Sequence, residues 1–142
     1  MPHDLPAAHI FHLCNAGAGL TQPKRIENRE WDTNHRGPLL IHAGKSRAWF
    51  KEFVNEVHWP PMTFGAIVGV VDLLDVWWCE ATAQAPEWIW SHEHRDPFAQ
   101  YWWLLGNVRK FAEPVPFRGA QGLFNVPAGA VASQLALTNA AK

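Results

Sequence analysis

Basic side chains are concentrated in one stretch of the sequence, residues 24–47. Three acidic residues accompany them there, so the stretch has a local excess of positive charge although the whole chain has a net charge of −1. A small excess of this kind suits contact with a few phosphates better than tracking along a duplex. The stretch is therefore either a solvated charged turn or one wall of a binding site. Its basic residues are Lys24, Arg25, Arg29, Arg36, Lys45 and Arg47.

Alternation along an extended chain determines which of these side chains can meet. In a strand over residues 24–29, Lys24 and Ile26 point to one side, while Glu27 and Arg29 point to the other. An ion pair between Glu27 and Arg29 is expected, and Lys24 joins it only if a turn or bulge precedes Ile26. Such a pair either orients the guanidinium toward a phosphate or base edge, or closes the mouth of the fold as a structural pair.

Four further residues of the stretch are candidate ligand contacts. Trp31 can stack on a base, which contributes roughly 1–3 kcal/mol per base, or it can pack over the turn. Arg36, before Gly37, can present its planar guanidinium to a phosphate or form part of a surface turn. Lys45 and Ser46 precede a predicted helix, whose N-terminal N–H groups favour anions. We expect them to contact a phosphate.

Histidines offer a weaker signal. His42 ends an apolar run and is interpreted as a hydrogen-bonded core residue rather than a catalyst. His92 and His94 have the spacing of a two-residue chelate that His58 or Cys79 would complete. Without a helical H-E-x-x-H pattern, a solvated loop is favoured there. The sequence therefore predicts neither a metal site nor a cofactor.

The hydrophobic pattern predicts more strands than helices. A short helix is expected over residues 5–13, and an amphipathic helix from Ser46 to residue 57, where apolar residues recur at helical spacing. A turn is expected at 114–119. Because the connections differ in length, we expect an α+β fold, a small mixed β-barrel, partly open, with flanking helices. The expected strands lie at 24–29, 37–43, 65–76, 98–111 and 120–127.

Tryptophan is unusually abundant, with nine residues, and most of these rings are expected in the core. Neighbouring residues of a strand face opposite sides of the sheet. One member of each adjacent pair should thus be core, and the other could reach the cleft or solvent. Alternatively, the excess Trp forms a protein–protein interface, which predicts a dimer. The pairs are Trp77–Trp78 and Trp102–Trp103.

Length and composition indicate one globular domain. The chain has 142 residues, 48% of them hydrophobic, and no apolar run approaches the ~20 residues that span a bilayer. The N-terminal residues lack the basic start of a signal peptide, and two cysteines are too few for a disulfide framework, which together favour a cytoplasmic protein. Residues 128–142 are Ala-rich and predict a frayed helix or a disordered tail after a domain of residues 1–127.

Three separated stretches together resemble the ASCH domain, named for activating signal cointegrator homology, within the PUA-like superfamily. They are KRIENREW followed by NHRGPLLIHAGK, then GAIVGVVDLLD, and finally PVPFRGAQGLFNVP. The family's K-x-x-E-x-R-x-W motif falls on Lys24, Glu27, Arg29 and Trp31. The similarity covers most of the chain, although the Gln and Trp of the family's usual first turn are missing here.

The resemblance implies a PUA-like β-barrel with a cleft beside the strand that carries this motif. It also implies binding of RNA, another single-stranded nucleic acid or a modified nucleoside, without a membrane. The cleft would be basic and lined by aromatic rings. Its expected contact residues are Lys24, Glu27, Arg29, Trp31, Arg36, Lys45 and Ser46.

An enzymatic alternative stays open. The resemblance includes a bacterial branch that hydrolyses N4-acetylcytidine with a Lys, a Thr three residues later and a distant Glu, and another relative that is a ribonuclease. In this chain Glu27 stands where that Thr would be, so the hydroxyl is absent. The alternative is then a hydrolase that acts on RNA or a modified nucleoside, with Lys24 and Glu27 as the acid–base pair.

Overall fold

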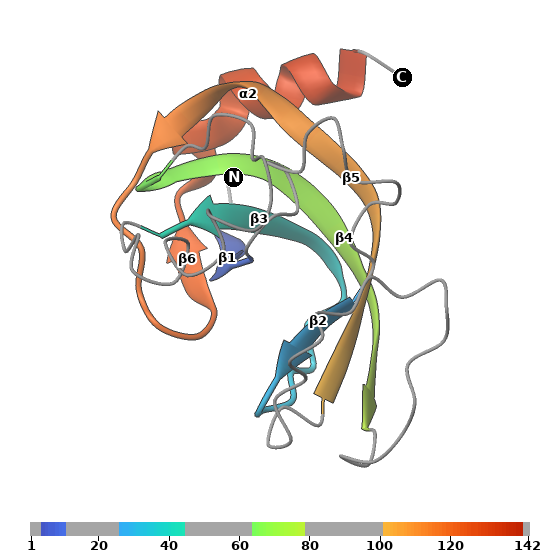
Figure 1. Cartoon of the computed structure of the whole chain (residues 1–142). Coiled ribbons are helices and arrows are strands. Elements are labelled where there is room, and N and C mark those ends of the chain that lie inside the picture. The colour runs from blue at the N-terminus through green and yellow to red at the C-terminus, as the bar shows by residue number, and fades with distance from the viewer. Residues whose placement is uncertain (1–3, 11–25, 45–63, 79–100, 141–142) are drawn as a thin grey trace, which may run out of the picture.

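The computed structural model describes residues 4–10, 26–44, 64–78 and 101–140 (Figure 1). These residues form a mixed sheet of six strands and one helix, which is an α+β fold. The elements are β1 (Leu5–His9), β2 (Ile26–Arg29), β3 (Gly37–Ala43), β4 (Ala66–Trp78), β5 (Tyr101–Pro116), β6 (Phe124–Val126) and α2 (Ala128–Ala140).

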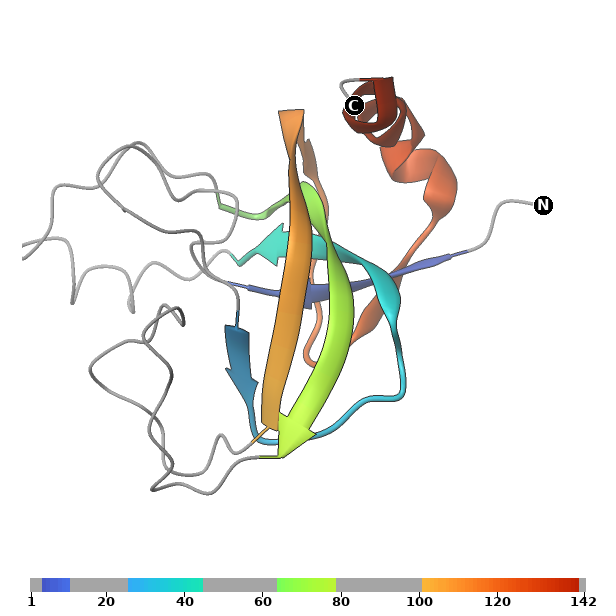
Figure 2. The same cartoon turned by 90° about the vertical axis from the view of Figure 1, so that its right-hand side faces the viewer.

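The sheet is strongly curved but not closed. Its strand order is β2-β5-β4-β3-β1-β6, so β2 and β6 are the two edges. β1 and β3 pair in parallel, and the other neighbours are antiparallel. Strands β3, β4 and β5 bend through one arc, with α2 on its outer side (Figures 1 and 2). The predicted α+β class and mixed sheet are confirmed, whereas the predicted barrel is not.

Two apolar layers cover the two faces of the central strands. On the concave face, Leu39 and Ile41 of β3 pack with Val71 and Trp103. Leu40, which lies between them in the sequence, faces the opposite way and packs in a second layer. Because β3 is buried on both faces, its sequence is a continuous apolar run rather than an alternating one. The strand predicted at 37–43 is confirmed.

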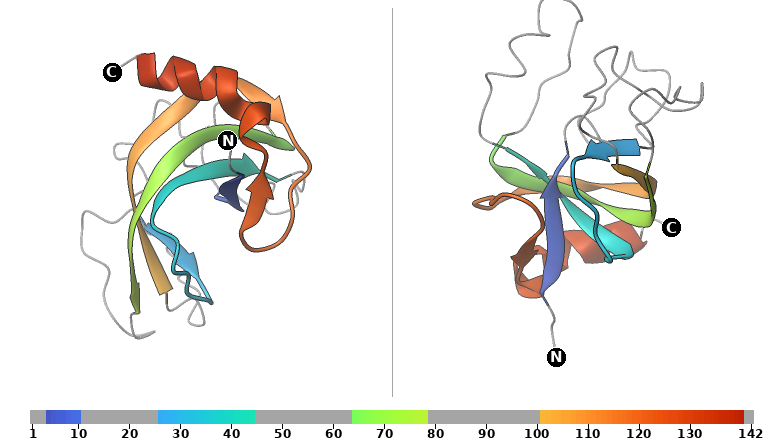
Figure 3. Two further views of the ribbon diagram at one scale, coloured as in Figure 1. Left: turned by 180° about the vertical axis from the view of Figure 1, so that it is seen from behind. Right: turned by 90° about the horizontal axis from the view of Figure 1, so that it is seen from below.

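Helix α2 covers the convex face. Val131 and Leu135, one helical turn apart, pack against the same layer as Leu40. Figure 3 shows the helix lying across the outer side of the sheet. The Ala-rich segment for which the sequence left a frayed helix and a disordered tail open is thus a helix from Ala128 to Ala140. No helix in the described part of the chain has the length and hydropathy needed to cross a membrane.

The predicted helix at 5–13 is wrong over its described part. Residues 5–9 form β1, an inner strand that pairs with β3 through Ala7 and Ala8, opposite Leu40 and Ile41. Both alanines are buried, one on each face of the sheet. Their small side chains let apolar layers pack closely on both faces, so tertiary pairing prevails over local helix propensity.

Strand β5 extends beyond its predicted end at residue 111. It continues through Pro116, so the turn predicted at 114–119 starts later. The pairing with β4 shifts register here, because Lys110 lies opposite Gly69 whereas Val115 lies opposite Ile67. Irregular strand segments of this kind accept proline, which lacks a backbone N–H for the ladder.

The prediction of one core member in each adjacent Trp pair is wrong for Trp77–Trp78, and in Trp102–Trp103 the second ring is buried as well. Trp102 and Trp103 are both buried, in different apolar clusters on the two faces of the sheet. Trp77 and Trp78, at the end of β4, are both exposed. Alternation places the rings on opposite faces, but what covers each face is set by other elements. The helix predicted over 46–57 lies outside the described residues.

Candidate functional site

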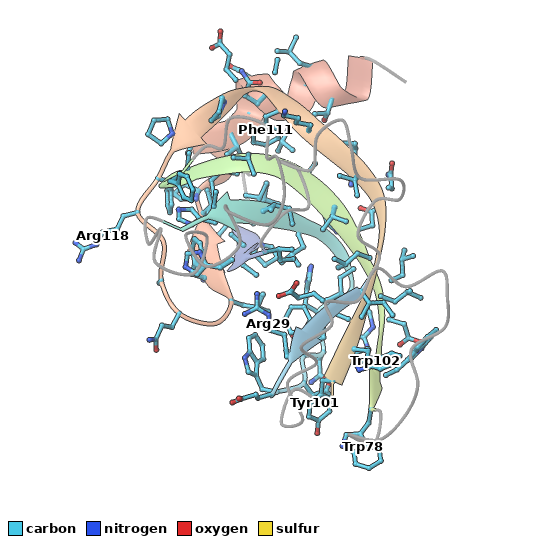
Figure 4. The ribbon with its side chains drawn as sticks, in the orientation of Figure 1. Arg29, Trp78, Tyr101, Trp102, Phe111 and Arg118 are labelled. Carbon is cyan, nitrogen blue, oxygen red and sulfur yellow. The ribbon has the colours of Figure 1, made fainter. Side chains whose placement is uncertain are left out.

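Strand β2 presents an acidic and a basic side chain on the concave face of the sheet. Ile26 points to the other face, where it is buried against Trp102. Glu27 and Arg29 therefore share one side, and the Arg29 Nη2 lies 3.3 Å from the Glu27 Oε1. The predicted ion pair is confirmed. Figure 4 shows the Arg29 side chain on the inner side of the arc.

The guanidinium of Arg29 connects two strands that are not neighbours in the sheet. Its Nη2 also donates a hydrogen bond to the backbone carbonyl of His9, in β1. Its Cζ lies 5.8 Å from the centre of the Trp103 ring, in β5. Three strands separate β2 from β1 in the sheet order, so this hydrogen bond crosses the open side of the curve. Arg29 thus has the structural role that was one of its two predicted roles.

Arg29 has donors that its described contacts do not use. Its Nε is buried, and no hydrogen-bond partner for it exists among the described residues. Leaving a buried N–H unsatisfied costs roughly 1–3 kcal/mol, so an acceptor placed there is favoured by a similar amount. The side chains of Arg29 and Glu27 are 21% and 12% exposed, so solvent only partly reaches the pair.

Trp31 is fixed beside this pair. Its ring meets that of Trp103 edge to face, with centroids 4.9 Å apart and an interplanar angle of 90°. The Trp103 Nε1 donates to the Trp31 carbonyl at 3.4 Å. Trp31 is only partly buried against the concave layer. The Trp31 ring therefore packs over the turn and also keeps an accessible part. Stacking of a base on that part stays a prediction.

Arg36 makes its described contacts elsewhere. Its Nη1 donates to the carbonyls of Thr33 and His35, both at 2.8 Å, within its own turn. Its Nη2 forms an exposed ion pair of 3.4 Å with Asp75 of β4. Backbone and Trp77 indole hydrogen bonds, followed by the charge of Arg36, lower the pKa of the Asp75 carboxyl. These contacts agree with the surface turn that was the alternative prediction.

The remaining predicted site residues lie outside the described part of the chain. This applies to Lys24, Lys45 and Ser46, and to the candidate chelating residues His58, Cys79, His92 and His94. The acid–base pairing of Lys24 with Glu27 accordingly stays a prediction. Among the described residues, no three His, Cys, Asp or Glu side chains are grouped as metal ligands would be.

A pair of histidines next to this site was only half predicted. His42 is a buried, hydrogen-bonded residue as expected, and its Nε2 lies 2.7 Å from the Phe117 carbonyl oxygen. Its Nδ1 lies 2.9 Å from the Nδ1 of His9. His9 was missed because residues 5–13 suggest a helix. Only the parallel register of β1 and β3, which sets His9 beside His42, brings the rings together.

The environment of His9 disfavours its charged form. Burial is the main cause that lowers the pKa of His9 below 6.5, and the charges of His42 and Arg29 lower it further. Backbone contacts with Ala120 and His42 act in the opposite direction and do not outweigh them. The neutral form of His9 is therefore favoured at pH 7.

A scan against models of protein families gives no match, and a search among curated proteins gives none either. The resemblance to the ASCH domain therefore stays a prediction that depends on the quoted motifs.

Proposed function

We propose that the concave face of the sheet binds single-stranded RNA, another single-stranded nucleic acid or a modified nucleoside through Arg29 and Trp31. The observation that carries this proposal is the unused, buried Nε of Arg29, on a guanidinium that is already held in place. A fixed donor of this kind is suited to an acceptor of the ligand, such as a base carbonyl or a phosphate oxygen.

The neighbours of Arg29 support a binding role. Glu27 forms an ion pair with Nη2, and the His9 carbonyl accepts a hydrogen bond from the same nitrogen, so both hold the guanidinium without using its Nε. A donor that is oriented before the ligand arrives loses little conformational entropy on binding. The nearby Trp31 ring, which is partly exposed, offers a surface on which a base can stack.

The stretch that contains the site adds positive charge. Residues 24–47 hold six basic and three acidic residues. Phosphate contacts made by a few of them would give binding a moderate dependence on salt. The resemblance to the ASCH domain points to the same class of ligand.

Fluorescence anisotropy with labelled single-stranded RNA and DNA at two salt concentrations tests the proposal. Binding should weaken with salt, and Arg29→Lys should lower affinity at least about tenfold because a point charge does not replace the lost donors. Arg109→Lys is the matched control, since the Arg109 Nε already donates to the Asn107 carbonyl at 3.0 Å. No binding at low salt, or equal losses in both variants, would contradict the proposal.

A further inference from the structure

Three side chains form a row across the end of the sheet that carries the proposed binding site. Arg29 of β2 lies opposite Tyr101 of β5, and Tyr101 lies opposite Trp78 of β4. Both pairings are antiparallel, and directly opposite residues in such a ladder have Cβ atoms about 5 Å apart. The Arg29–Tyr101–Trp78 row therefore extends the site from the edge strand β2 onto the two longest strands.

The whole row belongs to the concave face. Tyr101 packs at the margin of the concave apolar layer, and so does Val76. Trp78 follows Val76 by two residues in the same strand, so alternation places it on the face of Val76. The ladder keeps its register between these positions, since Val76 lies opposite Trp103 just as Trp78 lies opposite Tyr101. The row thus shares its face with the Trp31 ring.

The two rings of the row are accessible to a ligand. Trp78 is 58% exposed and has neither a hydrogen bond nor a ring contact with another described residue. Tyr101 is half-buried, so the core supports the ring and leaves part of it open. Figure 4 shows both side chains at the same end of the sheet, below Arg29 in that view. Trp77, by contrast, donates its indole N–H to Asp75 at 3.0 Å.

We propose that the site takes a single-stranded nucleic acid of about three or more nucleotides rather than a free nucleoside, with one base on Trp31 and the next bases on Tyr101 and Trp78. The inference rests on the proposed function and narrows its ligand class. In RNA-recognition sheets, aromatic rings on one face stack about two or three successive bases.

The chemistry of the row favours a nucleic-acid chain over a nucleoside. Stacking on an aromatic ring tolerates any base, so each accessible ring adds affinity only if the ligand has a further base to place there. The unused Nε–H of Arg29 suits an oxygen of the phosphodiester that joins two bases, and a free nucleoside has no such oxygen. A row of rings beside one guanidinium is therefore matched to a repeating base–phosphate ligand.

Isothermal titration calorimetry at low salt with uridine 5′-monophosphate and with oligouridylates of increasing length tests the inference. The affinity should rise at least about tenfold from the monophosphate to the trinucleotide and change little beyond about four nucleotides. Equal affinity for the monophosphate and the hexanucleotide would overturn the inference while the proposed function stands. If no length binds at low salt, the proposed function fails and the inference falls with it.

Trp78→Ala separates stacking from the charge that longer oligonucleotides add, because it removes a ring and no charge. The affinity for the hexanucleotide should fall at least about fivefold, and that for the monophosphate less than about twofold. Trp78→Phe, which keeps a ring, should retain most of the affinity. Trp77→Ala is the matched control, since Trp77 is the adjacent exposed residue on the opposite face and should leave the affinity within about twofold. Equal effects of Trp77→Ala and Trp78→Ala would overturn the inference.

Sedimentation velocity without ligand tests a protein as the competing occupant of the row. We expect the same mass for the unchanged chain and for Trp78→Ala, because nucleotides and not a second copy cover the Trp78 ring. A dimer that Trp78→Ala dissociates would assign Trp78 to an interface between copies and would overturn the inference, while binding of the monophosphate by both proteins would leave the proposed function standing.

Discussion

Two arginine–carboxylate pairs on this sheet differ in how completely the guanidinium is used. Arg109 and Asp72 lie 2.6 Å apart, the Arg109 Nε donates to the Asn107 carbonyl, and the second Asp72 oxygen accepts from the Asn107 Nδ2 at 3.0 Å. In the Arg29–Glu27 pair, one nitrogen, Nη2, both faces the Glu27 carboxylate and donates to the His9 carbonyl, and the buried Nε has no described partner.

The comparison shows that residue type and burial alone do not separate a structural pair from a binding group. Side-chain exposure is 15% for Arg109 and 21% for Arg29, so the two arginines are buried to a similar extent. What differs is the unused donor. The Arg109 Nε has an acceptor within the protein, whereas the buried Arg29 Nε has none among the described residues, and under the proposed function a ligand supplies it.

The largest expected effect is on stability, through replacement of each arginine by Met. Arg29→Met should lower the free energy of unfolding by about 2–4 kcal/mol, because it removes one charged partner of the partly buried Glu27 carboxylate and breaks the link to β1. Arg109→Met should cost about 1–2 kcal/mol, since Asn107 still donates to Asp72. Urea unfolding of both variants provides the measurement. Equal losses would remove the distinction between the pairs.

A second prediction concerns how β1 is kept in position to accept from Arg29. Gly119→Ala forces a methyl group against His9 and His42, and should lower stability by about 1–3 kcal/mol through overpacking. Gly129→Ala is the control, because a Cβ there meets nothing within 4 Å and alanine favours the helix. In thermal unfolding, the melting temperature should fall for Gly119→Ala and should not fall for Gly129→Ala. A Gly119→Ala protein as stable as Gly129→Ala would show that the segment between β5 and β6 does not hold the histidine pair in place.

The smallest effect is expected at the third described arginine–carboxylate pair. Arg36 and Asp75 form an ion pair whose side chains are 41% and 53% exposed, where solvent screens the interaction. Arg36→Ala should leave the unfolding midpoint nearly unchanged and should affect ligand affinity only through salt-dependent attraction. A loss of affinity as large as that of Arg29→Lys, and insensitive to salt, would move the site toward the 33–36 turn.

The local parts of this arrangement were predictable from the sequence. Apolar Ile26 between charged residues fixes the faces of β2, and so the meeting of Glu27 and Arg29. The run from Gly37 to Ala43 defines a strand buried on both faces. Each of these patterns depends on neighbours within a few residues, where alternation and side-chain type are sufficient.

The rest depends on contacts between distant segments. The Arg29 hydrogen bond to the His9 carbonyl joins residues 20 apart, and the histidine pair joins residues 33 apart. Neither is encoded in a local pattern, and the small residues around His9 suggest a helix instead. That the Nε of Arg29 stays unused follows only from where its neighbours lie in space. For the same reason, the identity of the two edge strands, β2 and β6, was not predictable.

The central claim is tested most directly by the Nε–H signals of the two arginines in 15N–1H spectra during titration with single-stranded RNA. If the concave face binds through the unused donor, the Arg29 Nε–H should shift downfield and exchange more slowly with water as RNA is added, while the Arg109 Nε–H stays unchanged. RNA binding that leaves the Arg29 Nε–H unaltered, or that shifts both signals alike, would contradict the account.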